Sequence, residues 1–224
     1  HMTADNEFVL FHDQNLDRTT NGSGEIRHFV LKELQQLDAG YEFTSDEGKT
    51  FPFRGKDLKI HTLDEILPMF PNVRFNLDIK ARNPMAPKLL ADKLKKLDIE
   101  LRVMVGSFHQ KQVKRFRDHS PVKTSAGPLE VFHFLWKYLL NKRKIPKLFN
   151  EEKLPKNSEE IRINQQKIFS NALPYSALQI PIRYSLIKLI TPDFIQFAHY
   201  LGIAIHVWTI NNSDTMIKLL KWGV

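Results

Sequence analysis

The stretch FVLFHDQNLDRTTNGSG, residues 8–24, changes from apolar to polar between Phe11 and His12. The four apolar residues Phe8–Phe11 predict a short buried strand that ends on His12 and Asp13. A polar loop with two glycines follows, and it carries Arg18. A strand that ends on a histidine and an aspartate places ionisable groups at its carboxyl end, where α/β proteins usually hold their chemistry.

Strands and helices alternate along much of the remaining chain. Further strands are expected over Val73–Lys80, Leu101–Phe108 and residues 121–127, 177–182 and 203–210. Helices are expected over Met85–Ile99 and residues 110–119, 191–202 and 213–223, the last two capped by Thr191 and by Ser213 or Asp214. This order predicts an α/β protein with a TIM (β/α)8 barrel that these residues leave incomplete. An open doubly wound sheet is the structural alternative, although no glycine-rich nucleotide motif supports it.

The chain is expected to form a single barrel domain over residues 1–224, with two departures from the alternation. Residues 14–62 are loop-rich and read as a small insertion after the His12-Asp13 pair. Residues 128–172 form a variable segment that is apolar at first and then strongly basic.

Composition narrows the class of protein. The 224 residues are 42% hydrophobic and contain no cysteine, so any metal must be held by oxygen or imidazole ligands. The formal charge of +8 favours anionic partners such as phosphate groups or an acidic membrane surface. No apolar run reaches the roughly 18 residues that a transmembrane helix needs. A cytoplasmic or membrane-associated location is favoured, but the sequence does not fix the compartment.

An ordered set of motifs identifies a family resemblance. The pattern T-x-D…V-x-x-H-D-x-x-L-x-R-T-T-x-G-x-G covers residues 3–24. ELQQLDAG (33–40), IHTLDEIL (60–67), FNLDIK (75–80), GSF (106–108) and HVWTINN (206–212) follow in order. Together they resemble the glycerophosphodiester phosphodiesterase family, and the resemblance covers the chain apart from roughly residues 128–172.

The resemblance implies a TIM barrel that hydrolyses glycerophosphodiesters to glycerol 3-phosphate and an alcohol. It also implies two histidines as general acid and base, and a divalent cation, Ca²⁺ or Mg²⁺, held by three carboxylates. By matching motif, His12 would be one catalytic histidine and Asp78 a metal ligand. Lys80 would bind the phosphate, while Trp208 and Phe108 would line the substrate pocket.

Some family motifs are not present. The H-R-G and E-x-D motifs, which supply the second histidine and two metal carboxylates, would lie upstream of residue 1. The closing D-G-I-x-T-D strand would follow Val224. The expectation is therefore a chain trimmed at both ends. Asp78 also stands where most members carry glutamate, and the shorter carboxylate still suits a hard cation.

The residues alone leave several of these roles open. A neutral histidine titrates near working pH and suits proton transfer, but for a lone His12 the preferred interpretation is a core or capping histidine bonded to Asp13. Asp78 and Lys80 share one face of a strand, which could be a barrel interior or an exposed sheet face. Trp208 without the resemblance would be a core residue, and packing is as plausible for Phe108 as a pocket role.

Three further polar residues receive structural interpretations. Asp13 would start the turn or orient the histidine, with the turn preferred. Arg18 would anchor the loop through Asp17 or a backbone carbonyl. Asn211 would cap the helix that follows it, in preference to lining a pocket.

Residues 131–147 combine an aromatic-rich helix with basic flanks. Such a helix can lie at a membrane interface and attract anionic lipid, which predicts contact with a membrane surface. A buried barrel helix or a dimer contact is the alternative.

The leading functional prediction is therefore a metal-dependent phosphodiesterase acting on a small glycerophosphodiester. A lysophospholipase D-like or sphingomyelinase D-like activity is a close variant. A non-catalytic barrel that binds lipids or anions is the alternative from another class. Nucleic acid is not predicted as a partner, because the lysines spread over helix faces without a known binding motif.

Overall fold

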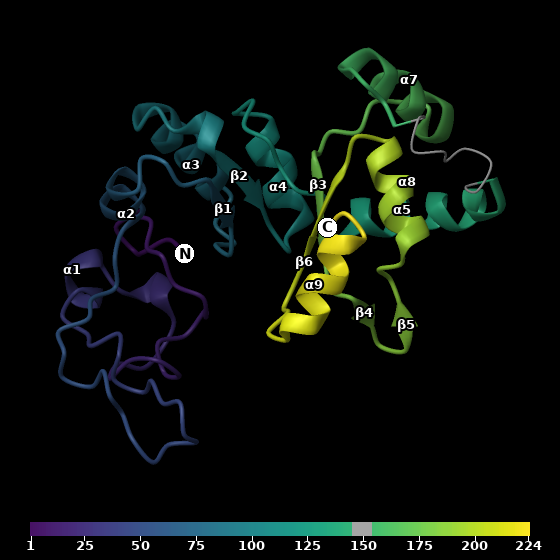
Figure 1. Cartoon of the computed structure of the whole chain (residues 1–224). Helices are drawn as coiled ribbons and strands as arrows, with labels where there is room; N and C mark the ends of the chain where they lie inside the picture. The colour runs from purple at the N-terminus through teal and green to yellow at the C-terminus, as the bar shows by residue number, and fades with distance from the viewer. Residues whose placement is uncertain (145–153) are drawn as a thin grey trace. The chain divides into compact units, whose positions relative to one another are not determined.

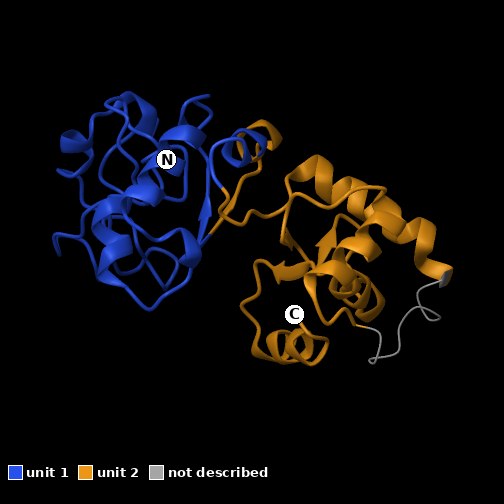
Figure 2. Cartoon of the chain, turned by 90° about the horizontal axis from the view of Figure 1, so that it is seen from above, with its two compact units in different colours: residues 1–103, 114–120 blue, residues 104–113, 121–224 orange. Residues whose placement is uncertain are grey.

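The computed structural model describes residues 1–144 and 154–224, which form two compact units. The first unit comprises residues 1–103 and 114–120, and the second comprises residues 104–113 and 121–224 (Figure 2). The strands are β1 (Phe75–Asp78), β2 (Val103–Gly106), β3 (Ala177–Ile180), β4 (Arg183–Tyr184), β5 (Ile187–Lys188) and β6 (Ala204–Val207). The α-helices are α1 (Leu31–Leu34), α2 (Leu63–Met69), α3 (Ala86–Lys96), α4 (Gln110–Arg117), α5 (Pro128–Asn141), α7 (Ser158–Phe169), α8 (Pro192–Tyr200) and α9 (Ser213–Lys221). Short 3-10 helices cover Ile26–His28, Glu100–Arg102 and Lys142–Lys144.

The first unit is built around a small apolar core beneath a loop-rich segment. Val9 packs there with four buried residues drawn from residues 14–62, namely Leu16, Ile26, Leu34 and Ile60. Phe8–Phe11 does not form the continuous strand that its apolar run predicts. It makes isolated antiparallel bridges instead, Met2 with Phe8 and Val9 with Thr62. The apolar run is explained by the burial of Phe8 and Val9. Its backbone partners are Met2 and Thr62, the N-cap of α2.

The second unit contains a parallel ladder in sequence order. Val105 of β2 bridges Thr124, Ser125 bridges Ala177, and β3 pairs with β6 along its length, from Ala177–Ala204 to Ile180–Val207. Helices follow these strand segments, as a barrel requires (Figure 1). Residues 121–127 contribute only two bridges where a strand is expected. Over the described ranges the strands do not close into a barrel.

The core of the second unit lies on one face of the β3–β6 pair. Leu178, Ile180 and Ile205 point toward it, together with buried aromatic residues of α5 and α8. Phe134 stands at its centre, with its ring 5.4 Å from Phe197 and 5.8 Å from Phe194, both in edge-to-face contacts. Such contacts add to the stability gained by apolar burial. The opposite face of β3 and β6 is left to polar and aromatic residues.

Helix caps confirm one prediction and correct another. Thr191 caps α8, because its hydroxyl accepts a hydrogen bond from the Phe194 N–H at 3.2 Å. Neither Ser213 nor Asp214 caps α9, and Asn211 does not either. Asn212 is the N-cap, with its Oδ1 accepting from the Thr215 N–H at 2.9 Å. Four consecutive polar residues, 211–214, could each have capped the helix. The backbone places Asn212 three residues before the Thr215 N–H, which has no partner within the helix.

Helix α5 is apolar on two faces. Phe134 and Tyr138 are buried in the core, and the other face exposes large apolar side chains. We call this second face the α5 outer face; it comprises Leu129, Phe132, Trp136, Leu139 and Leu140. Within residues 1–144 and 154–224, no helix is long and apolar enough to cross a membrane. Residues 145–147 of the predicted membrane-contact segment lie outside the described residues.

Candidate active site

His12, Asp13 and Arg18 form one hydrogen-bonded network. The His12 Nδ1 lies 2.6 Å from Asp13 Oδ1, and Arg18 grips both carboxylate oxygens, with Nε to Oδ2 at 2.5 Å and Nη2 to Oδ1 at 2.9 Å. The Arg18 guanidinium, followed by the hydrogen bond from His12, holds the pKa of the Asp13 carboxyl well below its usual range. Because Asp13 stays ionised, it accepts a hydrogen bond from His12, so Nδ1 carries the proton and Nε2 is the acceptor in the neutral ring.

This geometry corrects the structural interpretation of Arg18. Its partner is Asp13 and not Asp17, whose Oδ2 accepts a hydrogen bond from the Gly24 N–H at 3.0 Å. The planar guanidinium of Arg18 can donate two parallel hydrogen bonds, and it makes both to the Asp13 carboxylate. Asp13 orients His12 as well as shaping the turn. The side chain of His12 remains 82% exposed, so Nε2 is accessible to a substrate.

The other motif residues of this loop hold its backbone. Leu16 is fully buried, and its N–H donates to the Gly24 carbonyl at 3.0 Å. The Thr20 hydroxyl donates to the Leu16 carbonyl and accepts from the Gly22 N–H, both at 2.9 Å. Gly24 has a φ of +101°, a region that side-chain-bearing residues avoid. The loop is therefore a supported platform for His12.

The T-x-D part of the motif has a structural role. Thr3 donates a hydrogen bond to Asp5 Oδ1 at 2.5 Å, and the same oxygen accepts from the Leu31 N–H at 3.1 Å. Asp5 thus satisfies a free N–H at the start of α1. The spacing of Thr3 and Asp5 is therefore explained by these hydrogen bonds, which fix the start of α1, without a catalytic role.

Asp78 and Lys80 lie side by side at the end of β1. Lys80 Nζ is 3.0 Å from Asp78 Oδ2, and each side chain is about 30% exposed or less. The pair is therefore half-buried rather than on the exposed sheet face that the alternation also allowed.

The second oxygen of Asp78 fits a cation ligand. Its Oδ1 is buried and has no hydrogen-bond partner among the described residues. A buried carboxylate oxygen without a donor is costly unless a cation or water satisfies it. Over residues 1–144 and 154–224, no cluster of three or more His, Asp or Glu residues is arranged to hold a metal ion. Asp78 would thus supply one ligand of a larger set.

Phe108 and Trp208 meet at the carboxyl ends of two parallel strands in the second unit. Phe108 follows β2 and Trp208 follows β6, and their rings make an edge-to-face contact with centroids 5.6 Å apart. They are 63% and 40% exposed, so Trp208 is not the core residue that its apolar strand suggests. The strand alternation explains this result, because Ile205 and Val207 face the core side and Trp208 points the other way. The pair forms an accessible aromatic wall.

A polar layer lies below this wall on the same face of the ladder. A side chain at Gly106 would meet Ser125 Oγ at 2.6 Å and Gln179 Oε1 at 3.2 Å, so these polar groups approach the Gly106 backbone closely. Gln179 in turn pairs in register with His206, whose pKa is lowered by burial. Sequence reasoning missed Ser125 and Gln179. A signal that could have identified them is that Ser125 and Gln179 lie on strand segments that pair with, or follow in the ladder, the strands of the GSF and HVW motifs.

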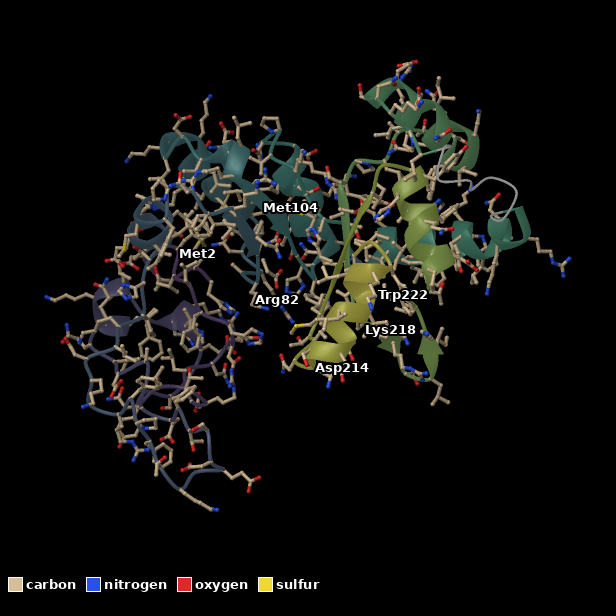
Figure 3. All side chains as sticks on the ribbon, viewed as in Figure 1. Met2, Arg82, Met104, Asp214, Lys218 and Trp222 are labelled. Carbon is tan, nitrogen blue, oxygen red and sulfur yellow. The ribbon has the colours of Figure 1, made fainter. Side chains whose placement is uncertain are left out.

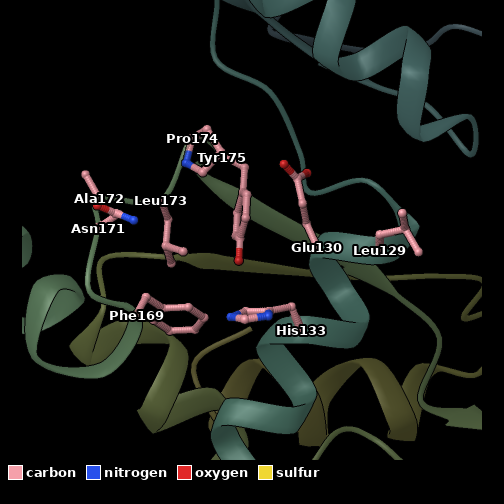
Figure 4. A pocket seen from close by; sticks show the side chains of 9 residues that line it. All are labelled: Leu129, Glu130, His133, Phe169, Asn171, Ala172, Leu173, Pro174 and Tyr175. Atoms are coloured by element: carbon pink, nitrogen blue, oxygen red, sulfur yellow. The ribbon is translucent and has the colours of Figure 1, made fainter.

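A separate pocket of roughly 260 Å³ opens between α5 and the segment before β3. The His133 ring lies beside Phe169, with Tyr175 on the other side of the pocket (Figure 4), and the His133 and Phe169 ring centres are 5.5 Å apart. Glu130 lines the pocket, but its carboxylate already accepts from the Gly127 N–H at 2.7 Å. This pocket lies at the amino-terminal side of β3 and contains none of the predicted site residues.

Trp222 at the end of α9 illustrates how basic residues are placed in this unit. Lys218 and Lys188 hold their ammonium groups 5.1 and 5.3 Å from its ring centre. Figure 3 shows Lys218 and Trp222 on the same helix. These cation–π contacts stabilise the packing of α9 and carry no catalytic group.

Comparison with known proteins assigns the family. The chain belongs to the glycerophosphoryl diester phosphodiesterase family, whose sequence profile matches residues 1–224. It is 24% identical over 234 residues to the glycerophosphodiester phosphodiesterase of Caldanaerobacter subterraneus subsp. tengcongensis, covering 100% of this chain and 76% of that protein. It is 28% identical over 127 residues to human lysophospholipase D, covering 54% of this chain and 38% of that protein.

A solved structure supports the fold. The chain is similar to a phosphodiesterase from Oleispira antarctica in complex with the product sn-glycerol-3-phosphate, with a TM-score of 0.62 and 19% identity. The likeness covers 100% of this chain and 74% of that one. At this identity it establishes the α/β, TIM-barrel-like fold, in agreement with the parallel ladder of the second unit.

Proposed function

We propose that this chain hydrolyses glycerophosphodiesters to glycerol 3-phosphate and an alcohol by histidine acid–base chemistry with a divalent cation. The single observation that carries the proposal is the His12–Asp13–Arg18 network. It fixes the imidazole through Nδ1 and leaves Nε2 exposed, in a chain of a phosphodiesterase family. An oriented imidazole with one accessible nitrogen suits proton transfer to and from the oxygen atoms that attack and leave phosphorus.

His12 would move a proton at Nε2. With Nδ1–H donated to an ionised Asp13, the neutral ring can accept a proton from an attacking hydroxyl, and the imidazolium can protonate a leaving alkoxide. Asp13 stabilises the positive charge that forms on the ring during this transfer, because it lies 2.6 Å from Nδ1. Arg18 keeps Asp13 ionised and in place.

Asp78 would hold the cation through Oδ1, which has no hydrogen-bond partner in residues 1–144 and 154–224, and Lys80 would bind a phosphate oxygen. When bound, Ca²⁺ or Mg²⁺ would neutralise negative charge on the phosphate. Oxygen donors suit either ion. Lys80 Nζ lies 3.0 Å from Asp78 Oδ2, so a phosphate bound by the Lys80 ammonium would lie beside a cation held by Asp78.

Phe108 and Trp208 would cover the apolar edge of the glycerol group. Their exposed faces and mutual edge-to-face contact make a flat wall that excludes water from one side of a small substrate.

The test measures glycerol 3-phosphate release from glycerophosphocholine by the full-length protein. After EDTA treatment the activity should vanish and return with Ca²⁺ or Mg²⁺. Asp78→Asn should lower metal-supported activity by about 10- to 100-fold. The matched control Asp92→Asn, which removes an exposed aspartate paired with Lys88, should leave it unchanged. A rate of glycerol 3-phosphate release that is unchanged by EDTA and by Asp78→Asn would overturn the metal proposal.

A lysophospholipase D-like activity is the alternative substrate assignment. The observation that favours it is the similarity of 54% of this chain to human lysophospholipase D. Release of choline from lysophosphatidylcholine, at a kcat/KM above that for glycerophosphocholine, would establish this alternative. If the folded protein turns over neither substrate, the non-catalytic anion-binding barrel becomes the better account.

Membrane contact through residues 131–147 accompanies these proposals. The α5 outer face exposes Phe132 by 70% and Trp136 by 54%, and Lys137, Lys142 and Arg143 lie on the same segment. An apolar surface with basic neighbours suits an anionic bilayer. Trp136→Ser with Leu139→Ser should weaken co-sedimentation with vesicles that contain phosphatidylglycerol. Binding equal to that of the native chain would exclude the α5 outer face as a contact.

A further inference from the structure

The β4–β5 hairpin has an apolar tip. Arg183 pairs with Lys188 and Tyr184 with Ile187, so Ser185 and Leu186 form a two-residue turn. Such turns favour glycine, asparagine and aspartate, because positive φ angles are needed. Ser185 adopts a φ of +53°, and a leucine occupies the next position. The turn therefore carries a residue that its geometry does not favour.

The tip side chains are exposed to an unusual degree. Leu186 is 90% exposed, Tyr184 72% and Ile187 66%. Single exposed apolar residues are common, but three large ones within four residues of one turn form a patch. Their placement costs stability unless the patch contacts another apolar surface.

The hairpin stands at the edge of the ladder where the aromatic wall lies. The Trp208 N–H donates to the carbonyl of Ile180, the last residue of β3, at 3.4 Å. Two residues later the Ile182 carbonyl accepts from the Leu189 N–H at 2.9 Å and closes the base of the hairpin. Figure 1 shows β4 and β5 beyond the carboxyl end of β3. The tip therefore belongs to the same edge of the second unit as Trp208.

The charge of the hairpin limits what it can contact. Residues 181–191 contain Arg183 and Lys188 and no acidic residue. Apolar side chains flanked by cations match a surface with phosphate groups outside and hydrocarbon beneath. A second copy of the hairpin would bring the same cations together, which disfavours self-association through this patch.

We infer that the β4–β5 hairpin inserts its tip, Tyr184, Leu186 and Ile187, into the surface of an aggregated single-chain phospholipid and so favours amphiphilic diesters over water-soluble ones as substrates. This inference rests on the proposed phosphodiesterase function and names the substrate class. The apolar tip meets acyl chains, while Arg183 and Lys188 lie at the depth of the headgroup phosphates. A water-soluble diester such as glycerophosphocholine offers the tip nothing to bind.

The test compares Leu186→Ser/Ile187→Ser with the native chain on two substrates. The ratio of kcat/KM for micellar palmitoyl lysophosphatidylcholine to that for glycerophosphocholine should fall at least about tenfold in the variant. The control Leu101→Ser removes a fully exposed leucine from the first unit and should leave the ratio unchanged. An unchanged ratio in the hairpin variant would overturn the inference.

A measurement without turnover separates this inference from the proposed function. Binding of the protein to micelles of hexadecylphosphocholine, followed by gel filtration, should weaken about tenfold in the same variant. If neither substrate is hydrolysed, the proposed function fails while loss of micelle binding still supports the hairpin contact. Micelle binding equal to that of the native chain, with an unchanged circular dichroism spectrum, would refute it.

Discussion

The His12 loop and the β4–β5 hairpin are both short connections, yet they are built in opposite ways. The first buries Leu16 completely and is held by side-chain hydrogen bonds: Thr20 donates to the Leu16 carbonyl, Asp17 accepts from the Gly24 N–H, and Arg18 donates to Asp13. The second exposes its largest side chains, Tyr184, Leu186 and Ile187, to solvent. A proposed catalytic histidine is thus held by hydrogen bonds to an ionised partner, whereas a proposed lipid contact needs only exposed apolar side chains on a two-stranded support.

Asp13→Asn should produce the largest effect on the rigid loop. Without the carboxylate, the His12 imidazole loses the partner that fixes its tautomer and stabilises its charge. The kcat for glycerophosphocholine should fall on the order of 100-fold or more. Because the pKa of Asp13 is lowered, its ionised form and the stability it confers should persist at every pH above its ordinary value of about 4 and be lost only below it.

A pH–rate profile and thermal unfolding check that prediction. The native profile should show no loss of activity from Asp13 protonation above about pH 4. A variant that keeps native kcat would show that the network is structural and does not act on the reaction.

Lys80→Met should come next in size. It removes the ammonium beside Asp78 and should raise KM for glycerophosphocholine by about tenfold or more, because a charge-assisted contact to phosphate is lost. Steady-state kinetics over a range of substrate concentrations measure the effect. The control Lys88→Met, on the exposed face of α3, should match the native chain. Equal KM values in both variants would remove Lys80 from the site.

Trp208→Ala tests the aromatic wall and should have a smaller effect. Loss of the indole should raise KM by about 5- to 10-fold with little change in stability, since the ring is 40% exposed. Trp136→Ala removes another exposed indole, from the α5 outer face, and should not alter hydrolysis of the soluble substrate. A fall in stability without any change in KM would return Trp208 to a packing role.

Asn212→Ala is expected to have the smallest effect and to act on the fold alone. Loss of the α9 cap should lower the free energy of unfolding by about 1 kcal/mol. Urea denaturation measures it. Asn211→Ala, its neighbour in sequence, should change stability by much less, and the reverse order would contradict the assigned cap.

The sequence predicted the ordered parts well. The helices over 86–96 and 192–200 and the strands at β1, β3 and β6 fall within the expected ranges because their periodicity is strong. The motif also led to His12, Asp78 and Lys80. The Arg18–Asp13 pair could not be foreseen, because Asp17 is nearer in sequence and only the fold of the turn decides between them. The exposure of Trp208 could not be foreseen, because most residues of its strand are apolar and the sequence does not show which face is covered.

The hairpin also escaped prediction for a physical reason. Residues 183–188 contain no glycine, asparagine or aspartate to mark a turn, so the segment reads as a continuation of a strand. Its antiparallel pairing depends on the positive φ angle of Ser185 and on the hydrogen bond that the Leu189 N–H donates to the Ile182 carbonyl at its base. Such local choices depend on tertiary context and leave no periodic signal.

The most direct measurement is the rate of glycerol 3-phosphate release from glycerophosphocholine by full-length His12→Ala, beside the native chain and His28→Ala. His28 is another exposed histidine of the first unit, without a predicted site role. The account predicts a fall of about 100-fold or more for His12→Ala and native activity for His28→Ala. Native activity in His12→Ala, with the fold intact, would contradict histidine catalysis at this loop.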